Sequence, residues 1–140
     1  MQEQILLQSK IEQGDFARGG EVSSSLKDML RKLGIKSDIS RRVTIVTYEL
    51  EMNIIIHSLG GEITVLISSE HIKVIAADRG PGIPDIEKAF QPGFSTADDF
   101  VRGMGFGAGM GLNNIRHYSD QLTVETGQGK QSKFAAVIHL

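Results

Sequence analysis

The sequence contains no cysteine and no tryptophan, only three prolines, and aromatic residues make up 6% of its 140 positions. Without cysteine there can be no disulfide, no thiolate metal ligand and no thiol nucleophile. The four histidines are scattered and have no metal-ligand spacing. No apolar run approaches the roughly 18 residues of a membrane span, and no signal peptide precedes the first predicted strand. We therefore expect a cytoplasmic protein with no membrane partner.

Excess charge of either sign is also lacking. Fifteen Lys and Arg residues stand against 17 Asp and Glu residues, which gives a formal net charge of −2. A protein without a basic surface is not expected to bind nucleic acid directly. With 40% hydrophobic residues, the chain is large enough to bury a core without disulfides or metals. We predict a single domain over residues 1–140.

Glycine, by contrast, is abundant, and half of the 16 glycines lie between Asp78 and Leu112. This stretch opens with the sequence Asp-Arg-Gly-Pro-Gly at 78–82, and every second residue from Gly103 to Gly111 is glycine. Glycine allows positive φ angles and a close approach to a ligand, and successive N–H groups can converge on an anion. A flexible linker is the alternative interpretation of such a run.

The residues that follow the glycines favour a phosphate site over a linker. Residues 112–118 predict a helix, so the run ends at a helix N-terminus, where the dipole and unpaired N–H groups attract phosphate. No G-x-x-x-x-G-K-[ST] motif occurs, which excludes a Walker-type loop. A dinucleotide fingerprint fits Gly103, Gly105 and Ala108, but the buried strand that should precede it is missing, so we discount it.

The hydrophobic pattern predicts an α+β fold. Possible helix caps lie at Ser23 to Ser25, and Gly34 supplies a stop. The helices can cover one face of a mixed, mostly antiparallel sheet, which gives a two-layer sandwich. The expected elements are a strand within 3–16, helices over 22–33 and 36–58, strands over 62–69 and 71–78, a helix over 112–118, and a hairpin of strands 122–125 and 134–138.

The helix over 36–58 has polar side chains on two opposite sides. At about 100° per residue, Glu49 and Asn53 lie one turn apart on one side, between two apolar flanks. One polar stripe can face water, but the other must face a polar partner inside the fold or a ligand cleft. Both stripes facing water is the alternative. The stripe opposite Glu49 and Asn53 consists of Thr44, Thr47, Glu51 and Ser58.

Two residues near these features have structural interpretations as well. Asp78 ends a predicted strand and leads into Gly80, where a turn carboxylate is as good an explanation as a ligand-binding one. His57 lies on an apolar flank of the long helix. That position predicts a packed, hydrogen-bonded core histidine rather than a ligand.

Three motifs, in the right order and at suitable spacing, resemble those of the GHKL superfamily of ATP-binding domains, which share the Bergerat fold. Residues 48–57 resemble its N box, residues 78–82 its D-x-G-x-G box, and residues 107–112 its second glycine box. The phrase Glu49-Leu50-x-x-Asn53-Ile54 and the single-domain size look most like the bacterial anti-sigma-factor serine/threonine kinases. Within that group, the sequence most resembles the branch of the stress-signalling switch kinases.

The resemblance implies ATP and Mg²⁺ as cofactors and assigns roles to residues. Asn53 would coordinate Mg²⁺, Glu49 would be the general base, and Asp78 would accept a hydrogen bond from the adenine amino group. A glycine-rich ATP lid would span about 79–108, where Lys88 and Arg102 are more simply explained as solvated charges than as phosphate ligands. Further nucleotide-binding residues by this resemblance are Gly80, Gly82, Gly105, Gly107, Gly109, Gly111 and Leu112.

The same resemblance implies a kinase that transfers the γ-phosphate of Mg-ATP to a small partner of the anti-sigma-antagonist (STAS) type. A sigma factor is a further expected partner, and a homodimer through the first strand and helix is suggested by analogy. The alternative function is a nucleotide-gated binding module that sequesters a regulator, in which Glu49 would be an incidental helix residue.

Overall fold

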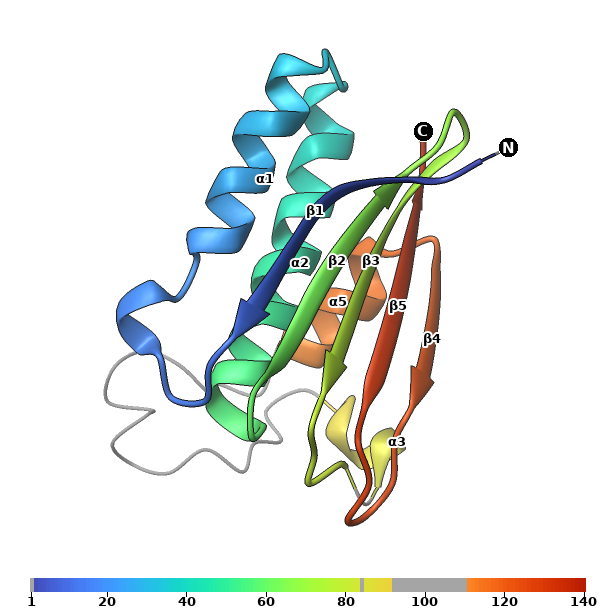
Figure 1. Cartoon of the computed structure of the whole chain (residues 1–140). Helices are drawn as coiled ribbons and strands as arrows, with labels where there is room; N and C mark the ends of the chain where they lie inside the picture. The colour runs from blue at the N-terminus through green and yellow to red at the C-terminus, as the bar shows by residue number, and fades with distance from the viewer. Residues whose placement is uncertain (1, 84, 92–110) are drawn as a thin grey trace.

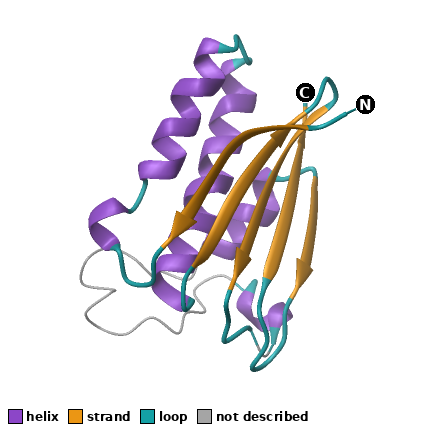
Figure 2. Ribbon diagram, in the orientation of Figure 1, coloured by secondary structure: helices purple, strands orange, loops and turns teal. Residues whose placement is uncertain are grey.

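The protein folds as one open sheet of five strands with helices packed on one face of the sheet (Figures 1 and 2). The structure, a computed structural model, describes residues 2–83, 85–91 and 111–140. Helix α2 lies against the sheet, and α1 and α5 pack on either side of it. The elements are β1 (Gln4–Ile11), η1 (Phe16–Arg18), α1 (Glu21–Lys32), α2 (Ser37–His57), β2 (Gly61–Ile67), β3 (His71–Asp78), α3 (Ile86–Ala89), α5 (Gly111–Tyr118), β4 (Gln121–Glu125) and β5 (Lys133–His139).

The strand order is β1-β2-β3-β5-β4, and each described pairing is antiparallel. The predicted α+β two-layer sandwich is therefore confirmed, without the parallel pairing that a mixed sheet would contain. Because β5 returns between β3 and β4, the strand that ends at Asp78 lies in the middle of the sheet. This places the end of β3 next to the loop that connects β4 with β5.

Alternate residues of the central strands face the helices and form the core. From α2, apolar residues one turn apart fill the space above the sheet, and α1 contributes two leucines. Full burial of side chains of this size stabilises the fold by about 1.5–3 kcal/mol each, which fixes α2 firmly in place. These residues, all buried, are Leu26, Leu30, Val43, Val46, Leu50, Ile54, Ile63, Val65, Ile72, Val74, Ala76, Phe134, Ala136 and Ile138.

Two predicted boundaries are shifted. The first strand ends at Ile11, the turn that the sequence predicts near Gly14 and Asp15 is present, and the short helix η1 starts at Phe16, the last residue of the predicted segment. The segment after Gly82, expected to be mostly irregular, contains the single helical turn α3, which Asp85 caps by accepting a hydrogen bond from the Lys88 N–H. No described helix has the length and apolar character needed to cross a membrane.

The N-terminus of α1 is capped from another helix, so the caps predicted at Ser23 to Ser25 are wrong. Helix α1 starts after Gly20, and the carboxylate of Glu51 on α2 accepts hydrogen bonds from the N–H groups of Val22 and Ser23 at 3.1 and 3.4 Å. Glu51 is only 1% exposed. A buried carboxylate at a helix N-terminus satisfies unpaired N–H groups and interacts favourably with the dipole.

The stripe that contains Glu51 therefore does not face water. Thr47 is fully buried and donates its hydroxyl proton to the Val43 carbonyl, and buried Ser58 bonds to the Gly60 carbonyl. These polar groups have found partners inside the protein, as buried polar groups require. The alternative, in which both polar stripes of α2 face water, is therefore excluded by the stripe that contains Glu51.

Candidate active site

Asp78 is the last residue of β3, and its carboxylate organises the turn that follows. One oxygen, Oδ1, accepts hydrogen bonds from the N–H groups of Gly80 at 2.8 Å and Ser132 at 3.1 Å. Within the described part of the chain, Oδ2 forms no hydrogen bond. Asp78 therefore stabilises the turn, as the structural interpretation predicts, and Oδ2 remains available to a ligand among the described residues.

The loop after Asp78 passes close to the β4–β5 loop, and this explains two glycines. Gly80 and Gly82 have φ angles of +98° and +88°, which side-chain-bearing residues rarely adopt. A Cβ atom on Gly82 would also overlap the Gly127 carbonyl. Both predicted glycines are therefore needed by the backbone path itself.

Two hydroxyl residues of the final hairpin support this loop and were not predicted. The hydroxyls of Ser132 and Thr126 lie 2.6 Å apart, and Thr126 accepts a hydrogen bond from the Ile83 N–H at 2.9 Å. Together with the Ser132 N–H bond to Asp78, they connect the start of the loop with its continuation. No local sequence pattern marks them, because their partners are more than 40 residues away in the chain.

Glu49 and Asn53 project from α2 on the side opposite Glu51. Both are half-buried, and neither side chain forms a hydrogen bond with any residue that the structure describes. Burial raises the pKa of the Glu49 carboxyl above its ordinary value. A carboxylate with a raised pKa and no hydrogen-bond partner among the described residues is suited to accepting a proton from a bound molecule.

Glu49 faces the first residue of α5. A Cβ atom at Gly111 would lie 2.6 Å from Oε2 of Glu49, so a side chain there would displace the carboxylate from its present position. The first turn of α5 contains no acidic residue that would repel a phosphate, and a helix N-terminus favours an anion. Leu112, the next residue, is half-buried and packs against the core rather than lying free in the site.

The structure brings these parts together at one end of the sheet. The N–H of Leu59, just beyond α2, donates to the Gly80 carbonyl at 2.9 Å, so the end of α2 adjoins the loop after Asp78. In Figure 1 the end of α2, the end of β3 and the start of α5 all lie at the lower end of the molecule. The described residues fit a nucleotide: a carboxylate with a free oxygen, two unpaired polar side chains and a helix N-terminus.

Other predicted residues have different outcomes. His57, predicted as a packed core histidine, is the last residue of α2 and has an exposed surface, although partial burial of its ring lowers the pKa of the imidazole. Lys88 lies on α3. Gly105, Gly107, Gly109 and Arg102 lie outside the described residues, as does most of the predicted lid.

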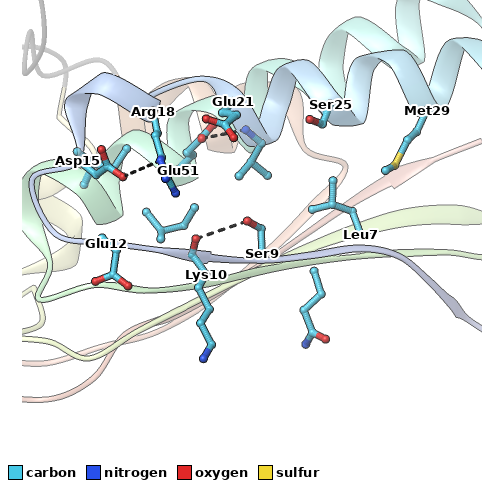
Figure 3. A pocket seen from close by; sticks show the side chains of 14 residues that line it. Leu7, Ser9, Lys10, Glu12, Asp15, Arg18, Glu21, Ser25, Met29 and Glu51 are labelled. Atoms are coloured by element: carbon cyan, nitrogen blue, oxygen red, sulfur yellow. Dashed lines mark hydrogen bonds and ion pairs between the residues drawn. The ribbon is translucent and has the colours of Figure 1, made fainter.

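The structure also has a groove that the sequence did not predict (Figure 3). It has a volume of about 290 Å³ and lies between β1 and α1, and Asp78 is not among the residues that line it. Leu7 of β1 points toward Met29 of α1 across it, whereas Lys10 points away. The buried carboxylate of Glu51 lines its floor, and Arg18, paired with Asp15 at 3.7 Å, lies at one end.

The fold and the site define a nucleotide-binding α+β domain of the Bergerat type. Residues 38–140 match the family model described as "Histidine kinase-, DNA gyrase B-, and HSP90-like ATPase". The match includes α2, the loop after Asp78 and α5. The chain belongs to this family, and an ATP-binding domain is what the family model represents.

Within the family, the chain is similar to named bacterial regulators. It is 29% identical over 115 residues to the serine/threonine-protein kinase RsbT of Bacillus subtilis (strain 168), which covers 79% of this chain and 80% of the relative. It is 31% identical over 133 residues to the anti-sigma F factor of Clostridium acetobutylicum (strain ATCC 824), covering 89% and 84%. The match to some other anti-sigma F factors covers less than two thirds of the relative's length. For the anti-sigma F factor of Thermoanaerobacter sp. (strain X514), it covers 62% of that protein.

A solved structure supports the fold. The structure titled "The crystal structure of SiaB-SiaC complex from Pseudomonas aeruginosa" contains a chain that matches with a TM-score of 0.65. The match covers 96% of this chain and 89% of the other, at 18% sequence identity. At that identity the likeness establishes the shared α+β architecture alone. The resemblance to the GHKL superfamily and its anti-sigma kinase group, predicted from three motifs, is confirmed by the family model and the named relatives.

Proposed function

We propose that this protein is an ATP-dependent serine/threonine kinase that phosphorylates a small partner protein in bacterial transcription or stress regulation. The observation that carries the proposal is the position of Glu49, a half-buried carboxylate that faces the N-terminus of α5 across Gly111. A phosphate held at that N-terminus would place its reacting end beside a proton acceptor. Phosphoryl transfer to a hydroxyl group requires such a proton acceptor beside the phosphate.

Each predicted site residue has a role in this proposal. Bound Mg-ATP supplies the phosphoryl group. Oδ2 of Asp78 would accept a hydrogen bond from the adenine amino group, and Gly80 and Gly82 would let the base approach the loop. Asn53 would hold Mg²⁺ through its amide oxygen, since this hard ion prefers oxygen ligands and keeps several waters. Glu49 accepts the proton of the attacking hydroxyl.

The remaining glycines belong to the proposed phosphate site and lid. Gly111 and Leu112 begin α5, and Gly105, Gly107 and Gly109 precede it outside the described residues. We propose that residues 1–140 act as a single ATP-binding kinase domain in which residues 79–108 are the approximate extent of the glycine-rich ATP lid.

The proposed partner is a STAS-domain protein of the anti-sigma-antagonist type. The names of the relatives, a serine/threonine kinase and anti-sigma factors, support a regulator that acts on another protein. A sigma factor is a second proposed partner, and a cytoplasmic location follows from such partners. No direct nucleic-acid partner is proposed.

We also propose a homodimer, formed at the groove of Figure 3. Among the described strands β1 is an edge, so one side of its backbone has no strand partner. Ile5 of β1 and Met29 of α1, which lines the groove, are 62% and 36% exposed, and an unpaired strand edge with exposed apolar residues can pair with another chain. A second copy that adds its own β1 would cover all of these groups.

A nucleotide-gated binding module is the second candidate function, because several relatives are named as anti-sigma factors. In that case ATP and ADP would select states with different affinity for the regulator. Equal affinity in the two nucleotides would exclude this candidate.

The test is phosphoryl transfer from γ-labelled ATP with Mg²⁺ into proteins of the source cell's lysate, using wild type, Glu49→Ala and Asp78→Asn. A small protein labelled by wild type alone would establish the kinase and identify its substrate. If Glu49→Ala labels the same protein as fast as wild type, the role of the carboxylate is wrong. If purified STAS-domain proteins are not labelled although wild type binds ATP, the binding module replaces the kinase.

A further inference from the structure

The residues just beyond α2 are hydrogen-bonded to the loop that carries Asp78. The antiparallel ladder of β2 and β3 continues past both strands, since the Leu59 N–H donates to the Gly80 carbonyl and the Arg79 N–H to the Gly60 carbonyl, each at 2.9 Å. The Arg79 side chain adds two bonds, because its Nε and Nη2 donate to the Leu59 carbonyl at 3.2 and 2.8 Å. Four hydrogen bonds therefore join the two segments.

Gly60 leaves room for the guanidinium group of Arg79. Its φ angle is +100°, and a Cβ atom there would overlap Nη2 of Arg79. Arg79 takes part in none of the ion pairs formed among the described residues. The guanidinium is thus hydrogen-bonded to the backbone of the α2–β2 connection, and no carboxylate of the described residues pairs with it.

This contact lies between the two halves of the proposed nucleotide site. Asn53, the proposed Mg²⁺ ligand, is one helical turn from the end of α2 at His57. Asp78, the proposed adenine acceptor, directly precedes Arg79. We propose that Arg79 is a positioning residue that fixes the distance between Asn53 and Asp78 so that one nucleotide can reach both, an inference that rests on the proposed ATP site.

The expected effect of losing this side chain is specific. The two backbone bonds remain, so the protein still folds, but the end of α2 is held less firmly against the loop. Each half of the site keeps its own contacts, and only their simultaneous engagement weakens. Losing a charged donor's hydrogen bonds should reduce the gain in ATP affinity that Mg²⁺ provides by about 3- to 10-fold.

The test is calorimetric titration of the full chain with ATP, once with excess Mg²⁺ and once with EDTA, well below the melting temperature. The variants are Arg79→Met and Arg79→Lys. Arg42→Met is a matched control, because Arg42 likewise donates from Nε to a carbonyl, that of Tyr118 at 3.1 Å, and pairs with Asp120, away from the site. A purely structural role would lower the melting temperature without changing the Mg²⁺ gain.

We expect Arg79→Met to lower the Mg²⁺ gain, Arg79→Lys to retain most of it, and Arg42→Met to leave it at the wild-type value. If the gain in ATP affinity from Mg²⁺ is unchanged in Arg79→Met, the inference is overturned. It is also overturned if Arg79→Met loses the same ATP affinity with and without Mg²⁺, because Arg79 would then affect only the adenine half of the site. Absence of ATP binding in wild type would instead overturn the proposed function.

Discussion

The two polar sides of α2 differ in what satisfies them. On one side Glu51 and Thr47 are buried, and their polar atoms bond to Val22, Ser23 and Val43 within the protein. On the other side Glu49 and Asn53 are half-buried, and their side chains form no hydrogen bond with any described residue. Residues of the same chemical type, two positions apart on one helix, therefore have opposite surroundings.

The difference indicates which carboxylate is structural and which is functional. Burial raises the pKa of both Glu49 and Glu51, but only Glu51 receives backbone N–H bonds that oppose the effect of burial on its pKa. Natural proteins rarely leave a desolvated carboxylate without compensation unless a ligand or a reaction uses it. Substitutions on the Glu49 side should therefore change activity, and substitutions on the Glu51 side should change stability.

The largest expected effect is on the Glu49 side. Glu49→Gln should lower phosphoryl transfer to the partner by about 10²- to 10⁴-fold, because it removes the proposed general base. Affinity for ATP should stay within about twofold, since the amide fills the same space. The measurement is single-turnover transfer from γ-labelled ATP, with Glu51→Gln as the control on the opposite side. Phosphoryl transfer by Glu49→Gln at the wild-type rate would show that Glu49 is not the functional carboxylate.

The next effect is on the Glu51 side and concerns stability. Glu51→Ala should lower the free energy of unfolding by about 2–4 kcal/mol, because two buried N–H groups of α1 lose their acceptor. Urea denaturation measures this. Glu21→Ala, an exposed acidic residue in the same helix turn, should cost less than about 0.5 kcal/mol. Equal losses in the two variants would show that the cap from α2 contributes nothing.

A smaller effect is expected at Asp78. Asp78→Asn keeps an acceptor for the N–H groups of Gly80 and Ser132 but weakens acceptance from the adenine amino group. ATP affinity should fall about 10- to 100-fold. Asp120→Asn is the control, because Asp120 also accepts a backbone N–H bond, from His139 at 2.7 Å, at the other end of the sheet. Equal ATP affinities of Asp78→Asn and Asp120→Asn would show that Asp78 does not bind the nucleotide.

The smallest effect is the pH dependence of stability at Glu49. Because burial raises its pKa in the folded state, the protonated form is favoured by folding and the ionised form is disfavoured. Stability is therefore fully present below the unfolded pKa of about 4.3 and is lost as pH rises through the higher folded pKa. Glu49→Gln, which cannot ionise, should melt about 1–3 °C above wild type at pH 8, with the difference vanishing toward pH 4. A difference that grows on acidification would reverse the assigned direction.

Much of this fold could be predicted because its signals are local. The two-residue alternation of β2 and β3 and the helical spacing of α1 and α2 are properties of neighbouring residues. The glycine motifs, together with Glu49 and Asn53, likewise form continuous phrases, and these phrases are sufficient to indicate the family. The positive φ angles at Gly80 and Gly82 show why those phrases need glycine.

What could not be predicted depends on contacts between distant residues. Periodicity placed Glu51 on a polar side of α2 but could not show that α1 would begin against it and take it as a cap. The support of Asp78 by Ser132 depends on β5 returning beside β3, which hydrophobic patterns do not specify.

The central claim is that nucleotide meets the Glu49 and Asn53 side of α2, and NMR of the ¹⁵N-labelled protein tests it most directly. Titration with Mg²⁺ and a non-hydrolysable ATP analogue should shift the side-chain amide of Asn53 and the backbone amides of Gly80 and Ser132. The amides of Val22 and Ser23, bonded to Glu51, should stay in place. The largest shifts at Val22, Ser23 and the groove beside β1, with Asn53 unchanged, would contradict the account.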